Sequence, residues 1–244
     1  MEDKIIGRNP VLEAIRSGRS IDKILIKKGK YEGSIVPIIK KAKEAKILIQ
    51  EVDKAKLDTI SEGENHQGVI AYVSAYDYVT VKDILLRAEE KGEPPFVIIC
   101  DKITDPHNLG AILRTANCVG AHGVIIPKRN SVGVNSIVAK TSAGAVEYTP
   151  VAKVTNIAGT IEDLKKEGMW IVGADMNGEE MYKVDLKGSL GLVIGSEGEG
   201  ISRLVREKCD FIASIPMNGQ INSLNASVAA GVLMYEALRQ RRVD

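Results

Sequence analysis

The strongest constraint on the fold is a series of short apolar segments that alternate with helical stretches from residue 96 onward. Segments such as FVIIC and GLVIG are apolar at nearly every position, which is typical of parallel strands buried on both faces. The alternation predicts an α/β fold in which helices cover both faces of a doubly wound parallel sheet. We expect strands at residues 96–100, 123–127, 147–150, 170–174, 190–195 and 211–215. We expect helices to begin near Asn108, Asn135, Asn156, Gly200 and Asn225.

The first 76 residues alternate in the same way, in shorter steps. We expect a first helix after Asn9, and then strand-like DKILIKK, ILIQEV and GVIAYV separated by helices over residues 34–46 and from Asp53. They predict a small α/β unit with mainly parallel strands. The following stretch is typical of a connector, with one helix capped by Thr80 and ended by Gly92 and two prolines. We therefore expect an N-terminal domain at 1–76, a linker at 77–94 and a C-terminal domain at 95–244.

Composition excludes several classes of protein. No apolar run in the 244 residues approaches the roughly 18 residues of a membrane span, so we expect no membrane part. The N-terminus, MEDKIIGRNP, carries acids and a proline where a signal peptide has a basic start and an apolar core, which predicts a cytoplasmic protein. Cys100, Cys118 and Cys209 show no CxxC spacing, so we expect no disulfide and no metal. Cys100 and Cys118 lie in apolar segments and are expected to be small core residues.

Positive charge is concentrated near the N-terminus. Residues 1–56 contain 14 Lys and Arg against 8 Asp and Glu, whereas the whole chain has a net charge of only +1. A basic module on an otherwise acidic body is typical of proteins that bind polyanions, because Lys and Arg displace counterions from phosphates. Lysine-rich segments such as IIKKAKEAK are also common as solvated helix faces, so charge alone leaves both interpretations open.

Two loops rich in Gly, Ser and Asn predict a ligand pocket lined by backbone. GSEGEG at 195–200 follows a strand segment, and NGQINSLN at 218–225 leads into a helix of small residues. Gly195, Gly198 and Gly200 let the main chain approach a ligand, while Ser223 and Asn225 can cap the last helix or contact that ligand. The turn after the first strand lacks GxGxxG, and the chain lacks GxxxxGK[ST], which excludes a dinucleotide fingerprint and a P-loop.

Three segments resemble the motifs of a known family. DKITDPHNLGAILRTA at 101–116, LVIGSEGEGIS at 192–202 and IPMNGQINSLNASVAAG at 215–231 resemble those of the SpoU family, the 2'-O-ribose RNA methyltransferases of the SPOUT superfamily. GRNPVLEAI and HQGVIA resemble the L30e-like substrate-binding domain of the branch that methylates a guanosine in 23S rRNA. The resemblance covers nearly the whole chain. Ala226, where the family pattern has valine, is one small departure.

The resemblance implies a fold and a cofactor that the alternation alone does not. It implies a C-terminal part threaded into a deep trefoil knot, although threaded chains are rare exceptions among protein folds. It implies S-adenosyl-L-methionine as the cofactor, bound against the backbone of Gly195, Ile215 and Leu224. It also implies a homodimer in which Arg114 of one subunit completes the site of its partner.

The resemblance further implies five catalytic residues, which are Asn108, Arg114, Glu197, Ser223 and Asn225. The family's proposal for the position of Arg114 is a general base, yet a guanidinium keeps its proton at neutral pH. We therefore predict that Arg114 clamps a phosphate and stabilises the developing alkoxide, and we leave the proton acceptor open. We expect Glu197 to orient Asn108 or Arg114. Ser223 and Asn225 are expected to hold the target nucleotide or to cap the last helix.

Two alternatives remain for the function, and three histidines are left outside the site. The substrate could be tRNA, because a single sequence does not show which RNA bases a protein recognises. The chain could also be a non-catalytic RNA-binding ribosome-assembly factor, which the intact set of polar site residues argues against. We expect His66, His107 and His122 to be surface residues.

Overall fold

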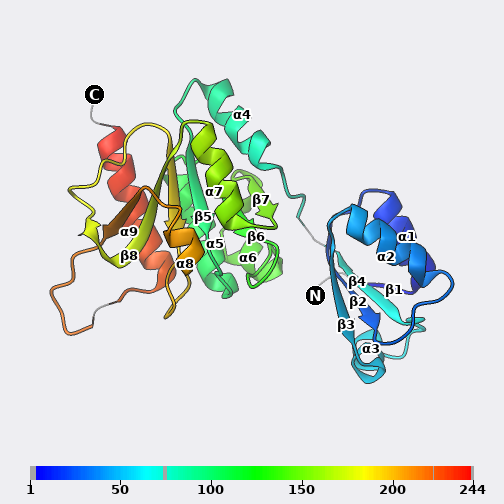
Figure 1. Ribbon diagram of the computed structural model, residues 1–244. Helices are drawn as coiled ribbons and strands as arrows, with labels where there is room; N and C mark the ends of the chain where they lie inside the picture. Colours follow the sequence, from blue (N-terminus) through cyan, green and yellow to red (C-terminus); the bar gives the residue numbers. More distant parts are fainter. Residues whose placement is uncertain (1–3, 74–75, 222, 243–244) are drawn as a thin grey trace. The chain divides into compact units, whose positions relative to one another are not determined.

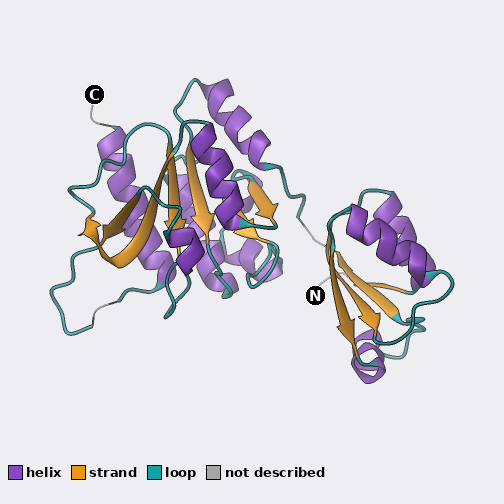
Figure 2. Ribbon diagram, in the orientation of Figure 1, coloured by secondary structure: helices purple, strands orange, loops and turns teal. Residues whose placement is uncertain are grey.

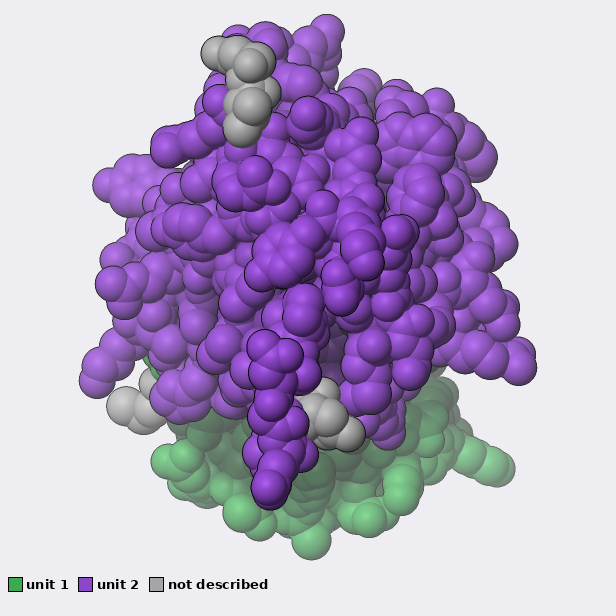
Figure 3. All heavy atoms as spheres, turned by 90° about the vertical axis from the view of Figure 1, so that its left-hand side faces the viewer, with its two compact units in different colours: residues 1–77, 134–136 green, residues 78–133, 137–244 purple. Residues whose placement is uncertain are grey.

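The computed structural model describes residues 4–73, 76–221 and 223–242, which form two compact units (Figures 1 and 3). One unit comprises residues 1–77 with residues 134–136, and the other comprises residues 78–133 with residues 137–244. Each unit is built around its own sheet. None of the helices within the described ranges is long and apolar enough to cross a membrane.

The N-terminal unit is a four-stranded sheet with helices on both faces (Figure 2). Its strand order is β1-β4-β2-β3; β2 and β3 are parallel, and β4 runs antiparallel to both β1 and β2. Successive residues of β2 face opposite sides: Ile24 and Ile26 pack with α1 and α2, and Leu25 packs with α3. The elements are β1 (Lys4–Ile6), α1 (Arg8–Arg16), β2 (Ile21–Lys27), α2 (Ile35–Glu44), β3 (Leu48–Val52), α3 (Lys54–Ser61) and β4 (Val69–Val73).

The expectation of mainly parallel strands in this unit is wrong for β4, and β1 was not expected. β1 has only three residues, and a strand so short shows no periodic pattern of apolar residues in the sequence. The helix α2 joins β2 to its parallel neighbour β3, but α3 packs on the opposite face. The chain then enters β4 in the reverse direction. Alternation of helices and strands does not tell which face each helix covers, so it could not predict this reversal.

The second unit contains a six-stranded, all-parallel sheet with the order β10-β8-β9-β5-β6-β7. The α/β class and the parallel sheet expected from the sequence are confirmed. The elements are α4 (Val81–Lys91), β5 (Phe96–Cys100), α5 (Pro106–Cys118), β6 (Gly123–Pro127), α6 (Ser136–Thr141), the 3-10 helix η1 (Ala145–Glu147), β7 (Val151–Val154), α7 (Ile157–Lys166), β8 (Trp170–Glu180), β9 (Leu190–Ile194), α8 (Arg203–Arg206), β10 (Phe211–Ser214) and α9 (Ala226–Arg241).

Helices cover both faces of this sheet, as Figures 1 and 2 show. On one face, α4, α7 and α8 bury Ile84, Ile161 and Val205 in a core shared with the central strands. On the other face α5 packs against α9, and their apolar side chains are fully buried where the two helices meet the sheet. Burial on both faces explains why β5 and β9 are apolar at nearly every position.

Three expected elements of the second unit differ from the structure. The strand expected at 147–150 is wrong: η1 occupies its start, and β7 begins after Pro150, which has no N–H to give to a ladder. The helix expected from Gly200 is only the single turn α8. Strand β8 runs six residues beyond the expected end at 174, because its polar extension pairs with β10. Gly178 lies in that extension, and a Cβ there would come within 2.4 Å of the Ile212 carbonyl oxygen.

The stretch expected to be a connector overlaps the second unit. Its helix, α4, begins at the predicted cap: Thr80 and Asp83 form a reciprocal capping box, and Gly92 ends the helix with a φ of 66°. Yet α4 buries Ile84 in the core of the second unit, where Gly123 of β6 makes room for it. A Cβ at Gly123 would lie 2.6 Å from the Ile84 side chain.

Two histidines and one cysteine lie where the sequence did not place them. His66 and His122 are buried rather than exposed, and Cys118 is exposed rather than in the core. His122 accepts a hydrogen bond from the Phe96 backbone N–H at 3.0 Å and contacts Glu93 at 3.1 Å. Burial lowers the pKa of His122 and outweighs the opposing effect of Glu93. Cys100 is buried as expected, and burial raises the pKa of its thiol to about 12.

Candidate active site

The candidate site is built from loops at the carboxyl ends of neighbouring parallel strands, where ligands bind in open α/β sheets. Strand β9 is flanked by β5 and β8, and the glycine-rich loop 195–202 follows it directly. That loop closes on itself through two backbone hydrogen bonds between Ser196 and Gly200, at 3.1 and 3.0 Å. Gly195 packs so closely on the turn that an added Cβ would lie 2.1 Å from the Gly200 carbonyl carbon. Only glycine fits at position 195.

Asp101 and Lys102, at the end of β5, fasten this loop to the sheet. The buried carboxylate of Asp101 accepts a hydrogen bond from the Ser202 backbone N–H at 2.7 Å, and its own N–H donates to the Ile194 carbonyl at 2.8 Å. The Lys102 ammonium lies 3.5 Å from the Glu199 carboxylate. The conformation of the loop is therefore set by residues about a hundred positions earlier in the chain.

Three side chains, one from each family-like segment, form a polar cluster. The Glu197 Oε1 atom accepts hydrogen bonds from the Asn108 amide at 3.0 Å and from the Asn225 amide, and a weaker one from the Ala226 N–H at 3.4 Å. Asn225 also donates to the Asn108 Oδ1 atom at 2.9 Å. Of the two partners expected for Glu197, Asn108 or Arg114, the structure shows a contact with Asn108. We refer to Asn108, Glu197 and Asn225 as the Glu197 cluster.

A helix start fixes the orientation of the Asn225 amide in the Glu197 cluster. Asn225 is the N-cap of α9, and its Oδ1 atom accepts hydrogen bonds from the N–H groups of Ser227 and Val228. Its amide nitrogen must therefore point away from the helix, toward Glu197. Helix α5, expected to begin near Asn108, begins at Pro106 and is capped by Asp105. The Asn108 side chain is thus free of capping and is buried against the cluster.

A pocket of about 790 Å³ opens beside the Glu197 cluster. All three residues expected to contact the cofactor line it, as do three of the five expected catalytic residues. The first three are Gly195, Ile215 and Leu224, and the others are Glu197, Ser223 and Asn225. Its volume lies within the range of small-molecule sites, roughly 300–1,000 Å³. Within the described ranges, no group of three or more His, Cys, Asp and Glu side chains is placed to hold a metal ion.

One wall of this pocket was missed at the sequence level. Residues 174–177 of β8 line it, and Asp175 is the charged residue among them. Burial acts to raise the pKa of Asp175, but the Asn177 backbone N–H at 2.9 Å and the Arg206 guanidinium at 2.5 Å outweigh it, so the pKa is lowered. The signal was available in principle, because polar residues that follow an apolar parallel strand lie at its ligand-binding end.

Arg114 lies apart from the Glu197 cluster. It follows Asn108 by six positions in α5, which places the two side chains about 9 Å apart along the axis and on different faces of the helix. Arg114 is exposed, does not line the pocket, and has no hydrogen-bond or ion-pair partner among the residues the structure describes. His107, in the same helix, is exposed as expected. The chain thus brings four of the five expected catalytic residues to the pocket and the Glu197 cluster, and Arg114 is the exception.

Comparison with known proteins identifies the family. The SpoU rRNA Methylase family model matches residues 95–235, and a second model, RNA 2'-O ribose methyltransferase substrate binding, matches residues 4–79. The chain belongs to the SpoU family. The resemblance seen in its motifs is therefore confirmed, and the chain is an RNA 2'-O-methyltransferase of the TrmH/SpoU group.

Relatives of the SpoU family match the chain over most of its length. The Bacillus subtilis protein YacO, whose name assigns it to the TrmH family of tRNA/rRNA methyltransferases, is 50% identical over 98% of this chain and 96% of its own. The SpoU methyltransferase AviRb from Streptomyces viridochromogenes, solved with AdoMet, covers 97% of this chain and 89% of its own, at 24% identity and a TM-score of 0.62. The A. aeolicus TrmH/SpoU tRNA modifying enzyme is 30% identical and covers 60% of this chain and 75% of its own, with a TM-score of 0.54.

Proposed function

We propose that this SpoU protein transfers a methyl group from S-adenosyl-L-methionine to the ribose 2'-hydroxyl of a guanosine in 23S rRNA. The observation that carries the proposal is the Glu197 cluster, a hydrogen-bonded carboxylate and two oriented amides at the rim of a nucleoside-sized pocket. Such a site can orient a hydroxyl against a reactive group bound beside it.

The residues of the pocket fit the proposed cofactor. Ile215, Leu224 and Leu233 supply apolar walls for an adenine, and the backbone from Gly195 to Gly200 supplies donors and acceptors at the edge. Bound there, the cofactor would supply a methyl group activated by a sulfonium. The lowered pKa of Asp175 keeps this carboxylate ionised on the opposite wall, where it suits a ribose hydroxyl or an amino group.

The Glu197 cluster would hold the acceptor ribose. The Glu197 Oε1 atom is committed to Asn108 and Asn225, which leaves the Oε2 atom to accept a hydrogen bond from the 2'-hydroxyl. Ser223 lines the same rim and can contact the ribose or its phosphate. Holding the hydroxyl in line with the methyl group can supply up to about 7 to 11 kcal/mol of the barrier.

Arg114 enters the proposal through a homodimer. Its exposed position on α5, away from the Glu197 cluster of its own subunit, supports a role in the site of a partner. The neighbouring helix α9 exposes Val228 and Tyr235, at 50% and 54%, which are apolar side chains that an interface would cover. In the partner's site Arg114 would clamp a phosphate and stabilise the alkoxide. We also retain the trefoil knot as a proposal, which rests on membership of the SpoU family.

Ribosomal RNA is the preferred substrate for two reasons. The family model that matches residues 95–235 is described for rRNA, and a separate model for substrate binding matches residues 4–79. The solved tRNA-modifying relative covers only 60% of this chain, whereas a solved rRNA methyltransferase from Sinorhizobium meliloti, 25% identical with a TM-score of 0.59, covers 97%. The name of YacO, which includes both RNAs, keeps tRNA as the second candidate. Either substrate would place the reaction in the cytoplasm.

The test is transfer of a labelled methyl group to unmodified 23S rRNA and to unmodified tRNA. We expect incorporation into 23S rRNA and a single primer-extension stop at a guanosine. Incorporation into tRNA alone would show that tRNA is the substrate in place of 23S rRNA, and the methyltransferase activity would stand. If neither RNA is labelled and calorimetry detects no cofactor binding, the catalytic function is wrong and a non-catalytic assembly factor becomes the better account.

A further inference from the structure

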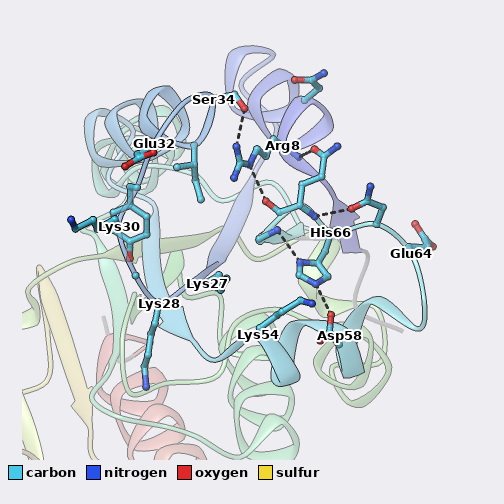
Figure 4. A pocket seen from close by; sticks show the side chains of 17 residues that line it. Arg8, Lys27, Lys28, Lys30, Glu32, Ser34, Lys54, Asp58, Glu64 and His66 are labelled. Carbon is cyan, nitrogen blue, oxygen red and sulfur yellow. Dashed lines mark hydrogen bonds and ion pairs between the residues drawn. The ribbon is translucent and has the colours of Figure 1, made fainter.

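The N-terminal unit contains a second pocket, of about 1010 Å³, formed within that unit alone (Figure 4). Its walls come from the start of α1, the loop between β2 and α2, the start of α3 and the loop that leads into β4. Its basic residues are Arg8, Lys27, Lys28, Lys30 and Lys54, and its acidic residues are Glu32, Asp58 and Glu64. We call this the Arg8 pocket.

The Arg8 pocket has more positive charge than its own carboxylates neutralise. Lys28 pairs with Asp53, at 3.4 Å, but none of the other four cations has a carboxylate within ion-pair distance in the part of the chain that is described. Of the pocket's acids, Asp58 is engaged by the buried His66, at 2.8 Å. An unneutralised group of cations in a concave surface focuses a positive potential and attracts polyanions.

Arg8 is held in place by neutral groups. Its Nε atom donates to the Gln67 carbonyl at 2.9 Å, its Nη1 atom lies 3.3 Å from the Ser34 hydroxyl, and its backbone N–H donates to the Gln67 Oε1 atom at 3.1 Å. Figure 4 shows the Arg8 guanidinium directed toward Ser34. These contacts orient the planar guanidinium without neutralising its charge. The paired N–H donors of a guanidinium match the geometry of the phosphate oxygens.

The loop that holds Arg8 is itself constrained. Gln67 has a φ of 50°, which is unfavourable for a residue with a side chain. The Asn65 side chain accepts a hydrogen bond from the Gln67 N–H at 3.3 Å, and His66 Nδ1 accepts one from the Gly68 N–H at 2.9 Å. His66 Nδ1 therefore carries no proton, and Nε2–H donates to Asp58. Strained backbone that the surroundings fix in this way is common where proteins clamp ligands.

We propose that the Arg8 pocket seats an unpaired nucleotide of the RNA substrate, with its phosphate on Arg8 and on the flanking Lys27 and Lys54. The proposal rests on the RNA substrate of the proposed function. The pocket is large enough for a nucleotide, and the exposed amides of Asn9 and Asn65 line it where a base edge would lie. Specific RNA recognition mostly uses unpaired bases of this kind.

The lysine-rich helix α2 is the competing site within the same unit. Its Lys40 and Lys43 are exposed, but they do not line the Arg8 pocket. A solvated helix face offers charge alone, whereas the Arg8 pocket combines charge, a fixed guanidinium and a concavity. Two pairs of exposed lysines can therefore be compared directly, because each pair removes the same charge from the same unit.

The first experiment measures binding of a labelled single-stranded RNA oligonucleotide to the full chain by fluorescence anisotropy at several salt concentrations. Removal of two phosphate contacts in Lys27→Ala/Lys54→Ala should make the slope of log K against log salt shallower by about 1.4 and weaken binding about tenfold or more. Lys40→Ala/Lys43→Ala should leave the slope near the wild-type value. Equal slopes for the two variants, or a larger effect of the α2 variant, would overturn the proposal.

A second experiment tests the unpaired nucleotide. We expect wild type to bind the single strand more tightly than the matching duplex, and Arg8→Ala to lose most of that preference. Thermal unfolding shows whether Arg8→Ala is folded, and the exposed lysine pair provides the test if it is not. An unchanged preference in the folded Arg8 variant refutes the pocket as the site.

Methyl transfer and cofactor binding separate this proposal from the proposed function. If wild type transfers methyl groups to RNA and the pocket variants bind RNA normally, the Arg8 pocket is not an RNA site and the proposed methyltransferase function stands. If the pocket variants lose RNA binding and wild type transfers no methyl group, the Arg8 pocket stands as an RNA site and the proposed methyltransferase function is wrong. Cofactor affinity should be the same in wild type and in all pocket variants.

Discussion

Replacement of Glu197 by glutamine tests the Glu197 cluster with almost no change in shape. The glutamine can keep an oxygen toward Asn108 and Asn225, but it loses the negative charge. A hydrogen bond to a charged group contributes about 1.5–3 kcal/mol and a neutral one about 0.5–1.5 kcal/mol. The two strong amide contacts would therefore lose about 2–3 kcal/mol together. Glu197 is exposed, so solvent screening reduces the expected loss to about 1 kcal/mol.

The effect on catalysis should be much larger than the effect on stability. A loss of about 1 kcal/mol lowers the unfolding temperature by roughly 2–4 °C in a unit of this size. If the second carboxylate oxygen accepts the 2'-hydroxyl hydrogen bond, loss of the charge should lower the single-turnover methyl-transfer rate about 100-fold. Cofactor affinity should change little, because the apolar walls and the backbone of the pocket are untouched.

The assay compares Glu197→Gln with Glu207→Gln, which removes an exposed carboxylate outside the pocket. Single-turnover transfer is measured at saturating RNA, cofactor binding by calorimetry and unfolding by circular dichroism. We expect the control to match wild type in all three. A Glu197→Gln protein that keeps more than half of the wild-type rate would refute the role of the carboxylate charge. A rate loss matched by an equal loss of cofactor binding would place Glu197 in the cofactor site instead.

Three further predictions concern the dimer, the loop and pH. Arg114→Ala should abolish transfer with nearly unchanged cofactor affinity, and mixing it with Glu197→Gln should restore part of the activity if the site forms across subunits; no recovery in proven heterodimers contradicts that arrangement. Gly195→Ala should destabilise the C-terminal unit by about 3 kcal/mol or more in urea unfolding, because the added Cβ would lie 2.1 Å from the Gly200 carbonyl carbon. At Gly198 an added Cβ meets no atom within 4 Å, so Gly198→Ala should cost only about 1–2 kcal/mol, for its positive φ. Equal costs for the two variants would disprove the packing argument. The pKa of Asp175 is lower in the folded protein, so its ion pair contributes stability above the unfolded pKa, near 3.8, and loses it as pH falls through the folded pKa. The difference in unfolding free energy between wild type and Asp175→Asn should therefore shrink below pH 3.8. A difference that does not change with pH would contradict the assignment.

The sequence carried enough information to predict the elements that rest on local signals. Continuous apolar runs placed β5 and β6 at their observed bounds, and Thr80 as the expected cap placed the start of α4. The motifs predicted that Glu197 orients Asn108 or Arg114, and the structure contains the contact with Asn108. Local pattern and motif order agree at these positions.

The features that were missed depend on partners distant in the sequence. The polar extension of β8 becomes a strand only because β10 pairs with it, so no apolar period marks residues 174–180. His66 and His122 are buried because Asp58 and Glu93 satisfy their ring nitrogens. The isolation of Arg114 from the Glu197 cluster follows from helix geometry. The motif order alone does not show on which face of α5 each residue falls.

Asn225 joins two roles that are usually separate, since one end of its side chain caps α9 and the other end contacts Glu197 and Asn108. Fraying of the last helix and loosening of the cluster should therefore be one event. A ligand that tightens the cluster should slow hydrogen exchange at the Ser227 and Val228 amides, although both belong to the helix. Those two amide protons would report occupancy of the pocket without any label on the ligand.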